Sequence, residues 1–548
     1  MRTLAVLVTA GVFLFLLTPP GPRHLDARGW DDLAARTVPG AYHVHSTRSD
    51  GHADRAAIAA AAARAGLKFV IVTDHGDGTR PPDGPAYIDG VLVLDGFEIS
   101  TDDGHYVAID MPRAPYPLGG SGESVVEDVR RLGGFGVIAH PDSPKPALRW
   151  TSTAVPDGVE WLNLDSEWRD ETRMRLLRIG AGYVLRPASA LTMILSRPAT
   201  LDARWPALLA TRPTIALAAA DAHGGVGRRN EDVSRNLAGS IGIPSYEASF
   251  RAFSNRVILP GPLSGDAMAD AKAIYQAIRG GSVFSSIDAQ AAPALLDFSV
   301  EAGYFRGGMG TVIGEDADAT LTARALVPDG SEMSIVRNGR IMTSSRTGEV
   351  RHVVTGGKGA YRVEVVAPGA HGTPPVPWLI SNAIYFGKAP APHVEPAMTP
   401  PAARVAPFPW RIEKDAASSG ILRTGDFDAT LEYKLGEGQR GAQFVAMATD
   451  LARQPFEIID LGLAGDRPMR VSVQLRTADG RRWGKSFYVD PAGSALRVGL
   501  SDLRAVGVMD QGPLSASDAT SLLLVIDLTN AAPGRSGTLK VLSSAFVR

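Results

Sequence analysis

Short apolar runs alternate with amphipathic stretches between residues 39 and 290. The apolar runs predict seven strands, at residues 40–46, 68–74, 91–98, 106–110, 135–140, 159–165 and 214–221. The amphipathic stretches predict five helices, at residues 54–65, 124–132, 170–177, 203–210 and 266–279. Strands that alternate with helices are typical of a parallel sheet or barrel. We therefore expect an α/β fold with a barrel at residues 39–290.

The helical pattern fades after residue 290. Residues 291–387 contain short alternating runs separated by Gly, Asp and Pro, which predict a β-sandwich domain. Residues 388–409 are rich in Pro and Ala and are interpreted as a linker. Residues 410–548 again contain only strand-like runs and predict a jelly-roll-like β domain. The predicted chain is thus a barrel followed by two all-β sandwich or jelly-roll domains.

Acidic residues and histidines stand where the predicted strands end. They occur as short motifs in the first 223 residues: His43-Val44-His45 with Asp50, Asp74-His75, Glu98 with His105, His140-Pro141-Asp142, and Asp221-Ala222-His223. In a parallel barrel the carboxyl ends of the strands meet at one mouth. Imidazole and carboxylate are the side chains that hold catalytic divalent metals. The motifs therefore predict a metal centre at that mouth.

The spacing within the motifs supports this interpretation. In a strand, His43 and His45 would point to the same face, because side chains alternate between faces. Asp221 and His223 repeat that spacing, and Glu98 is suited to bridge two metals. Asp74 could orient the ring of His75 from behind. A single His or Asp is often only structural, so it is the ordered set that predicts a metal centre.

This ordered set resembles the PHP (polymerase and histidinol phosphatase) superfamily over about residues 39–288. The resemblance implies a distorted seven-stranded β/α barrel with two or three divalent metal ions, usually Zn, Mn or Fe. It implies a first metal on His43, His45, Glu98 and Asp221. A second would share Glu98 and take His105 and His140. A third would take Asp50, His75 and His223.

Such a centre implies a hydrolytic mechanism. Metal ions lower the pKa of a bridging water and so supply hydroxide as the nucleophile. The candidate catalytic residues are Asp221, His140 and Asp142, with Asp221 or Asp142 as general base or water-orienting group. The candidate substrate residues are the cations Arg48, Lys145 and Arg228 beside the motifs, together with Glu160 and Asn163 at the end of another strand.

Composition and the amino terminus bear on compartment and partners. Arg2 precedes an apolar run from Leu4 to Leu17 that a Pro-rich segment ends, which predicts residues 1–25 to be a signal peptide or an uncleaved membrane anchor. We therefore expect an exported protein that meets a membrane only through this segment. The formal charge of −2 argues against a nucleic-acid grip. The chain has no cysteine and so no disulfides.

Three functions remain open at this point. The first is a phosphoesterase acting on a small phosphorylated molecule. The second is a carbamate or aryl ester hydrolase on the same barrel, kept open because no arginine cluster marks a phosphate site. The third is a surface protein that binds glycans through aromatic residues of the C-terminal domain, with the barrel as scaffold. These aromatic residues are Trp410, Phe427, Tyr433, Trp483 and Tyr488.

Overall fold

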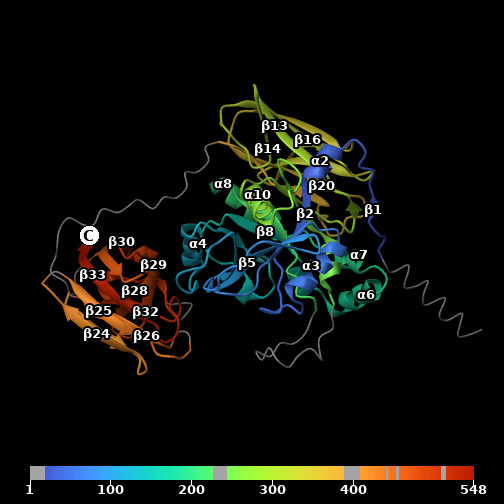
Figure 1. Ribbon diagram of the computed structural model, residues 1–548. Helices are drawn as coiled ribbons and strands as arrows, with labels where there is room; N and C mark the ends of the chain where they lie inside the picture. Colours follow the sequence, from blue (N-terminus) through green and yellow to red (C-terminus); the bar gives the residue numbers. More distant parts are fainter. Residues whose placement is uncertain are drawn as a thin grey trace, which may run out of the picture. The chain divides into compact units, whose positions relative to one another are not determined.

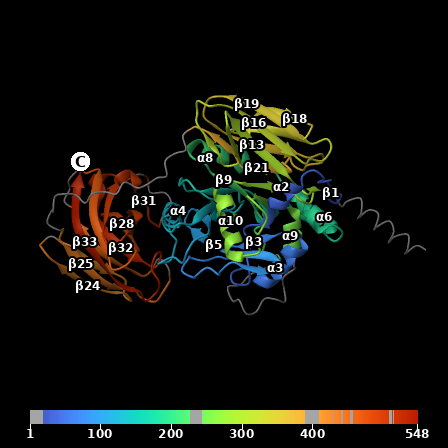
Figure 2. The same cartoon turned by 45° about the horizontal axis from the view of Figure 1, so that its top comes forward.

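The structure is a computed structural model that describes residues 19–225, 243–387 and 408–547, except 427, 440–441, 452–455, 508–511 and 513. Most of the predicted leader and of the predicted linker lies outside the described residues. The chain forms two compact units. The first comprises Met1–Gly76, Pro82–Pro112 and Val129–Ala391, and the second Asp77–Pro81, Arg113–Asp128 and Pro392–Arg548. Figures 1 and 2 show the chain from two directions.

A curled sheet forms the centre of the first unit, and seven of its strands lie side by side in chain order. They are β2 (Thr37–Ala41), β3 (Phe69–Val72), β5 (Val91–Thr101), β6 (Gly104–Ile109), β7 (Phe135–Ile138), β8 (Gly158–Asn163) and β9 (Ile215–Ala219). Neighbours are parallel except that β6 runs antiparallel to both β5 and β7. β4 (Ala86–Ile88) pairs with β5. Beyond β2 the sheet continues into further strands, so the α/β prediction is confirmed as a curled sheet rather than as a closed ring of seven.

The described residues also form helices, and most of these fall close to predicted positions. They are α2 (Asp31–Arg36), α3 (Arg55–Arg64), α4 (Gly122–Arg131), α5 (Leu164–Asp170), α6 (Arg173–Tyr183), α7 (Pro187–Leu191), α8 (Trp205–Thr211), α9 (Tyr246–Ala252) and α10 (Ala267–Arg279). Asp54 and Asp266 begin α3 and α10 by accepting from the amides of Ala57 and Ala269. The sequence pattern missed α5, because Asn163 ends β8 two residues before the predicted end and caps a helix there.

Strands from residues 291–387 extend the same sheet. β10 (Ser254–Ile258) pairs with β2, and β11 (Val283–Ser286) pairs with β21 (Leu379–Ser381). The sheet then passes through β20 (Gly359–Val366) and β22 (Ile384–Phe386) to β15 (Val312–Ile313), with β17 (Glu332–Arg337) and β18 (Arg340–Ser345) at its side. The boundary predicted at residue 290 therefore does not separate the two compact units.

Two smaller sheets complete the first unit. One joins β14 (Phe305–Gly308), β13 (Leu296–Ala302), β16 (Asp318–Ala325) and β19 (Glu349–Thr355). The other is a short pair between β1 (Arg23–His24) and β12 (Ala291–Ala292). Among the described residues, no helix is both long and apolar enough to cross a membrane.

The second unit contains a sandwich of two antiparallel sheets. The first sheet holds β23 (Arg411–Lys414), β26 (Phe444–Asp450), β32 (Ala519–Asp527), β28 (Met469–Thr477), β29 (Arg482–Val489) and β31 (Arg504–Ala505). The second holds β24 (Ser419–Thr424), β25 (Ala429–Lys434), β33 (Ser536–Val547), β27 (Ile458–Gly465) and β30 (Ser494–Gly499). Both sheets contribute to one apolar core, which contains Val473 and Leu524 from the first and Leu461 and Leu539 from the second. This agrees with the predicted β-sandwich.

Candidate metal centre

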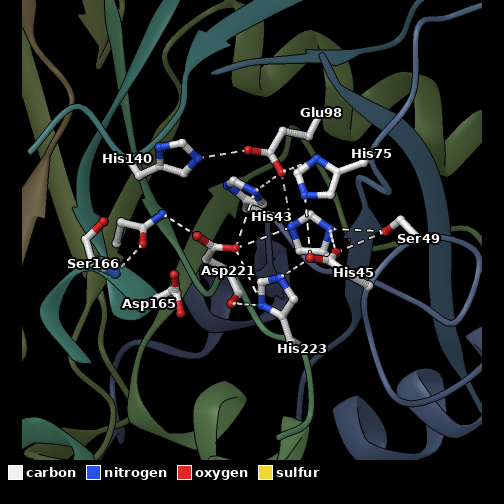
Figure 3. Close-up of polar contacts among 12 residues, drawn as sticks. His43, His45, Ser49, His75, Glu98, His140, Asp165, Ser166, Asp221 and His223 are labelled. Carbon is white, nitrogen blue, oxygen red and sulfur yellow. Dashed lines mark hydrogen bonds and ion pairs between the residues drawn. The ribbon is translucent and has the colours of Figure 1, made fainter. Parts of the chain in front are cut away.

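All nine predicted metal ligands gather at one edge of the curled sheet. Figure 3 labels seven of them, namely His43, His45, His75, Glu98, His140, Asp221 and His223. They form four overlapping groups whose candidate ligand atoms lie within 4.8 Å of one another. The groups are His43, His45 and Asp221; His45, Asp50 and His223; His45, His75 and Glu98; and Glu98, His105 and His140. Residues 180 positions apart in the sequence thus meet, as expected for strand ends that share one mouth.

Glu98 joins two of these groups through its two oxygens. Oε1 lies 2.7 Å from His105 Nδ1 and 2.9 Å from His140 Nε2. Oε2 lies 3.2 Å from Nε2 of both His43 and His45. The side chain is 2% exposed. A buried carboxylate that faces histidines on both sides has the geometry of a bridging ligand.

Two buried imidazole nitrogens show that the residues fit a cation. Nε2 of His43 and Nε2 of His45 are buried and have no hydrogen-bond partner of adequate geometry. Both face Oδ1 of Asp221, at 3.5 and 3.3 Å. A buried polar atom is costly to leave unpaired. Imidazole nitrogens and carboxylate oxygens that lie this close together are a donor set suited to divalent metal ions.

Asp50 organises the other side of the centre. Oδ1 lies 3.2 Å from His45 Nδ1, and Oδ2 lies 3.3 Å from His223 Nε2 and 3.6 Å from His75 Nε2. The rings of His45 and His223 stack at 4.3 Å. His45 therefore borders the groups assigned to the first and the third metal.

The chain reaches this geometry through unusual backbone conformations. His43, His140 and Asp221 have φ values of 61°, 29° and 41°. Non-glycine residues rarely adopt positive φ, and such strain is concentrated at functional sites. β2 ends at Ala41, before the positive φ of His43, so His43 and His45 lie beyond the strand rather than in it. The predicted strand at residues 40–46 is thus too long, although both imidazoles still converge on Glu98 and Asp221.

The antiparallel direction of β6 explains the position of His105. This residue stands near the start of its strand, whereas the other motifs follow strand ends. Because β6 runs against β5 and β7, its first residues lie at the edge where β5 ends. His105 is paired with Ser100 in this hairpin.

Glu160 and Asn163 lie beneath the centre. Glu160 is buried, and its Oε1 accepts from His43 Nδ1 at 2.6 Å while its Oε2 accepts from the amide of His140 at 2.6 Å. Asn163 donates to Glu160 at 2.8 Å and to Asp221 Oδ2 at 3.1 Å. These contacts turn Nε2 of His43 toward the centre. They favour a positioning role over the predicted contact with substrate.

Asp74 supports the centre differently from the expectation. Its carboxylate accepts from the amide and hydroxyl of Ser46 and from the hydroxyl of Ser49, at 2.6–2.7 Å. It therefore fixes the turn that carries Asp50 rather than the ring of His75. Neither serine hydroxyl was singled out by the sequence motifs.

The charges of the cluster are strongly coupled. Burial would lower the pKa of His45, but Asp221 and Glu98 raise it to about 10. Burial would raise the pKa of Glu98, but His43 and His75 hold it well below its usual range. Burial would also raise the pKa of Asp221, but His43 and His45 hold it well below its usual range. The carboxylates thus stay ionised and draw positive charge to this point.

The other predicted site residues have different surroundings. Asp142 is exposed and accepts from the amide of Thr200 at 2.8 Å. Arg48 donates to Asp83 at 2.8 Å. Lys145 is exposed. Arg228 lies outside the described residues.

The aromatic residues considered for glycan binding are mostly internal. Trp410, Tyr433 and Trp483 are buried in the core of the sandwich. Tyr488 donates its hydroxyl to Asp490, and Phe427 lies outside the described residues. Core packing therefore accounts for the three buried rings.

Comparisons with known proteins give only distant similarities. No family model matches the chain, and no curated protein matches it. A two-domain protein containing a predicted PHP-like metal-dependent phosphoesterase, from Bacteroides vulgatus, matches 67% of this chain and 100% of its own, with 12% identity and a TM-score of 0.28. The family 11 carbohydrate-binding module of a cellulosomal cellulase from Clostridium thermocellum matches 25% of this chain and 86% of its own, with 13% identity and a TM-score of 0.21. Because these scores are low, the side chains of the centre must carry the functional argument.

Proposed function

We propose that the chain is a multinuclear metal-dependent hydrolase that cleaves phosphate esters. The observation that carries the proposal is Glu98, whose two oxygens face separate groups of histidines. The nine predicted ligands would hold two or three divalent ions, which we propose to be Zn, Mn or Fe. When bound, such ions activate water and neutralise charge on the attacked group.

The chain's own residues prepare the site for this reaction. His140 Nδ1 lies 3.0 Å from the carbonyl of Leu148, so this nitrogen carries the proton and the lone pair of Nε2 is free for a bound cation. Asn163 donates to Oδ2 of Asp221, which leaves Oδ1 toward His43 and His45. We assign Asp221 to orienting the attacking water or accepting its proton. Asp142 is less suited to that role, because its carboxylate is engaged by Thr200.

We further propose that the protein is exported. The basis is the sequence alone, with Arg2 before the apolar run from Leu4 to Leu17. A small phosphorylated molecule outside the cytoplasm would then be the substrate.

The test is turnover by the metal-stripped chain reloaded with Mn or Zn. We expect metal-dependent release from p-nitrophenyl phosphate and little from p-nitrophenyl acetate. Asp221→Asn and His140→Ala should each lower kcat/KM for p-nitrophenyl phosphate. The loss should exceed the ~10–100-fold that follows when a residue hydrogen-bonded to a metal ligand is removed. His352→Ala, in β19, is the matched control. Full activity in either ligand variant would contradict the proposal, and release only from the ester would favour the ester hydrolase.

A further inference from the structure

An ion pair that the motifs did not single out lies at the start of α5. Asp165 and Arg169 stand four residues apart on this helix, and Nε of Arg169 donates to Oδ2 of Asp165. Their side chains are 22% and 36% exposed. The pair is therefore reachable from solvent and held in one orientation.

Asn163 joins the first turn of α5 to the metal centre. Its side chain accepts from the amide of Ser166 at 2.9 Å, which starts α5, and donates to Asp221 at 3.1 Å. Figure 3 shows Asp165 beside Asp221 and His223. The first turn of α5 is thus joined to a predicted ligand by one asparagine.

The guanidinium is held close to these ligands, since Nε of Arg169 is bonded to Asp165, which Figure 3 shows beside Asp221. Burial would lower the pKa of Arg169, but Asp165, Asp221 and Asp50 raise it. Burial and Asp221 both raise the pKa of Asp165. Arg169 therefore lies within the field of Asp221 and Asp50, which are assigned to different metals.

The two terminal nitrogens of the Arg169 guanidinium are available as hydrogen-bond donors. Among the described residues, Asp165 is the hydrogen-bond partner found for Arg169, and it takes only Nε. Arg48, one of the three predicted cations, is instead paired with Asp83. Arg149, near His140, donates to the carbonyl of Ser143. The two terminal nitrogens of Arg169 remain for an anion, and their fork matches two phosphoryl oxygens.

We propose that Arg169 binds the non-reacting oxygens of a phosphomonoester dianion, and that Asp165 is a positioning residue for it. This inference rests on the proposed function and names the substrate class of the same centre. A monoester dianion carries two negative charges over three terminal oxygens, whereas a diester carries one charge over two, so the guanidinium attracts the monoester more strongly. Arg169 therefore favours monoesters over diesters.

The experiment compares Arg169→Gln, Arg169→Lys and the control Arg173→Gln in the full chain. Substrates are p-nitrophenyl phosphate and bis-p-nitrophenyl phosphate, with inorganic phosphate as a competitive inhibitor. Loss of a charged hydrogen bond should lower kcat/KM for the monoester roughly 10- to 100-fold in Arg169→Gln and weaken phosphate inhibition by a similar factor. Diester turnover and metal content should stay within about 3-fold. Asp165→Asn should raise KM more than it lowers kcat.

Each result separates the two hypotheses. A wild-type chain that loads metal but cleaves neither phosphate ester contradicts the proposed function. A wild-type chain that cleaves the monoester, with Arg169→Gln equally active and equally inhibited by phosphate, overturns the role of Arg169. Loss of metal in both Arg169 variants would also overturn it, because the pair would then hold ligands rather than substrate.

Discussion

At the residue scale, Glu160 connects two predicted ligands. Its oxygens accept separately from His43 Nδ1 and from the His140 amide. Glu160→Gln should weaken binding of Mn or Zn about 10- to 100-fold, because an amide nitrogen would face one of these donors. Calorimetric metal titration measures this, with Glu301→Gln, an exposed residue of β13, as control. Unchanged affinity in Glu160→Gln would show that His43 is oriented without it.

A second residue, Glu167, makes stability depend on pH. Burial raises its pKa from 4.5 to about 7, although it accepts from the amide and hydroxyl of Ser196. The folded state therefore holds a proton that the unfolded state releases at lower pH. The contribution of the protonated Glu167 to the free energy of unfolding is fully present below about pH 4.5. It is lost as the pH rises to about 7.

Glu167→Gln removes this dependence and keeps an oxygen for Ser196. The variant should melt about 2 °C above the wild type at pH 8, and the difference should vanish near pH 5. Thermal melts of both proteins at the two pH values, with the same metal present, measure it. A constant difference at both pH values would count against the raised pKa.

Sequence motifs located the ligands better than the residues that hold them. All nine predicted ligands meet because each stands in a short acid or histidine motif that ends or begins a strand. Glu160 was predicted to contact substrate because it also stands near a strand end. Its burial beneath His43 depends on how β8 packs, which no local pattern records. Arg169 stands in none of the acid or histidine motifs. Its partner Asp165 is four residues earlier, on a helix that the sequence pattern did not predict.

At the element scale, two asparagines complete the hydrogen bonding of β9. Asn255 in β10 bonds both the amide and the carbonyl of Ala218, at 2.9 and 2.7 Å. Asn382 does the same for Ala216, at 2.7 and 3.0 Å. Beyond them, the segment after β2 bonds to Ala220 and Ala222. Side-chain amides thus take the place of a strand along the edge of β9.

Replacing either asparagine should therefore destabilise the first unit. Asn255→Ala and Asn382→Ala each leave a buried amide and a buried carbonyl without partners, at a cost of about 1–3 kcal/mol. Urea denaturation followed by tryptophan fluorescence measures the free energy of unfolding. Asn255→Asp should lower the free energy of unfolding more than Asn255→Ala does, because it loses the amide donor and buries a charge. Wild-type stability in both alanine variants would show that water replaces the amides.

The same network explains why the sequence did not predict β10 and β11. Both strands are buried, yet both carry polar side chains. These are Ser254, Asn255 and Arg256 in β10, and Ser285 and Ser286 in β11. Ser285 accepts from the indole of Trp161 and donates to Asn255. Buried polar side chains that satisfy one another break the apolar pattern on which strand prediction depends. The seven strands near predicted positions, in contrast, are apolar runs, such as Val70-Ile71-Val72 in β3.

At the scale of the whole molecule, metal binding should stabilise only one of the two units. The predicted ligands lie in the first unit, whereas the sandwich core contains residues 410–541 and none of them. Three carboxylates and six imidazoles that converge in a buried site need positive charge, so a bound cation favours the folded state over the unfolded chain. Chelation should remove that gain from the first unit and leave the sandwich unaffected.

Differential scanning calorimetry with and without EDTA tests this. We expect two transitions, of which chelation lowers one by several degrees and leaves the other in place. The affected transition should be the one that Asn255→Ala also lowers, because both changes act on the first unit. The Glu160→Gln variant should need less EDTA than the wild type for the same shift, since its metal is held more weakly. If chelation moved both transitions equally, or neither, the nine ligands would not be acting as the metal centre of one unit.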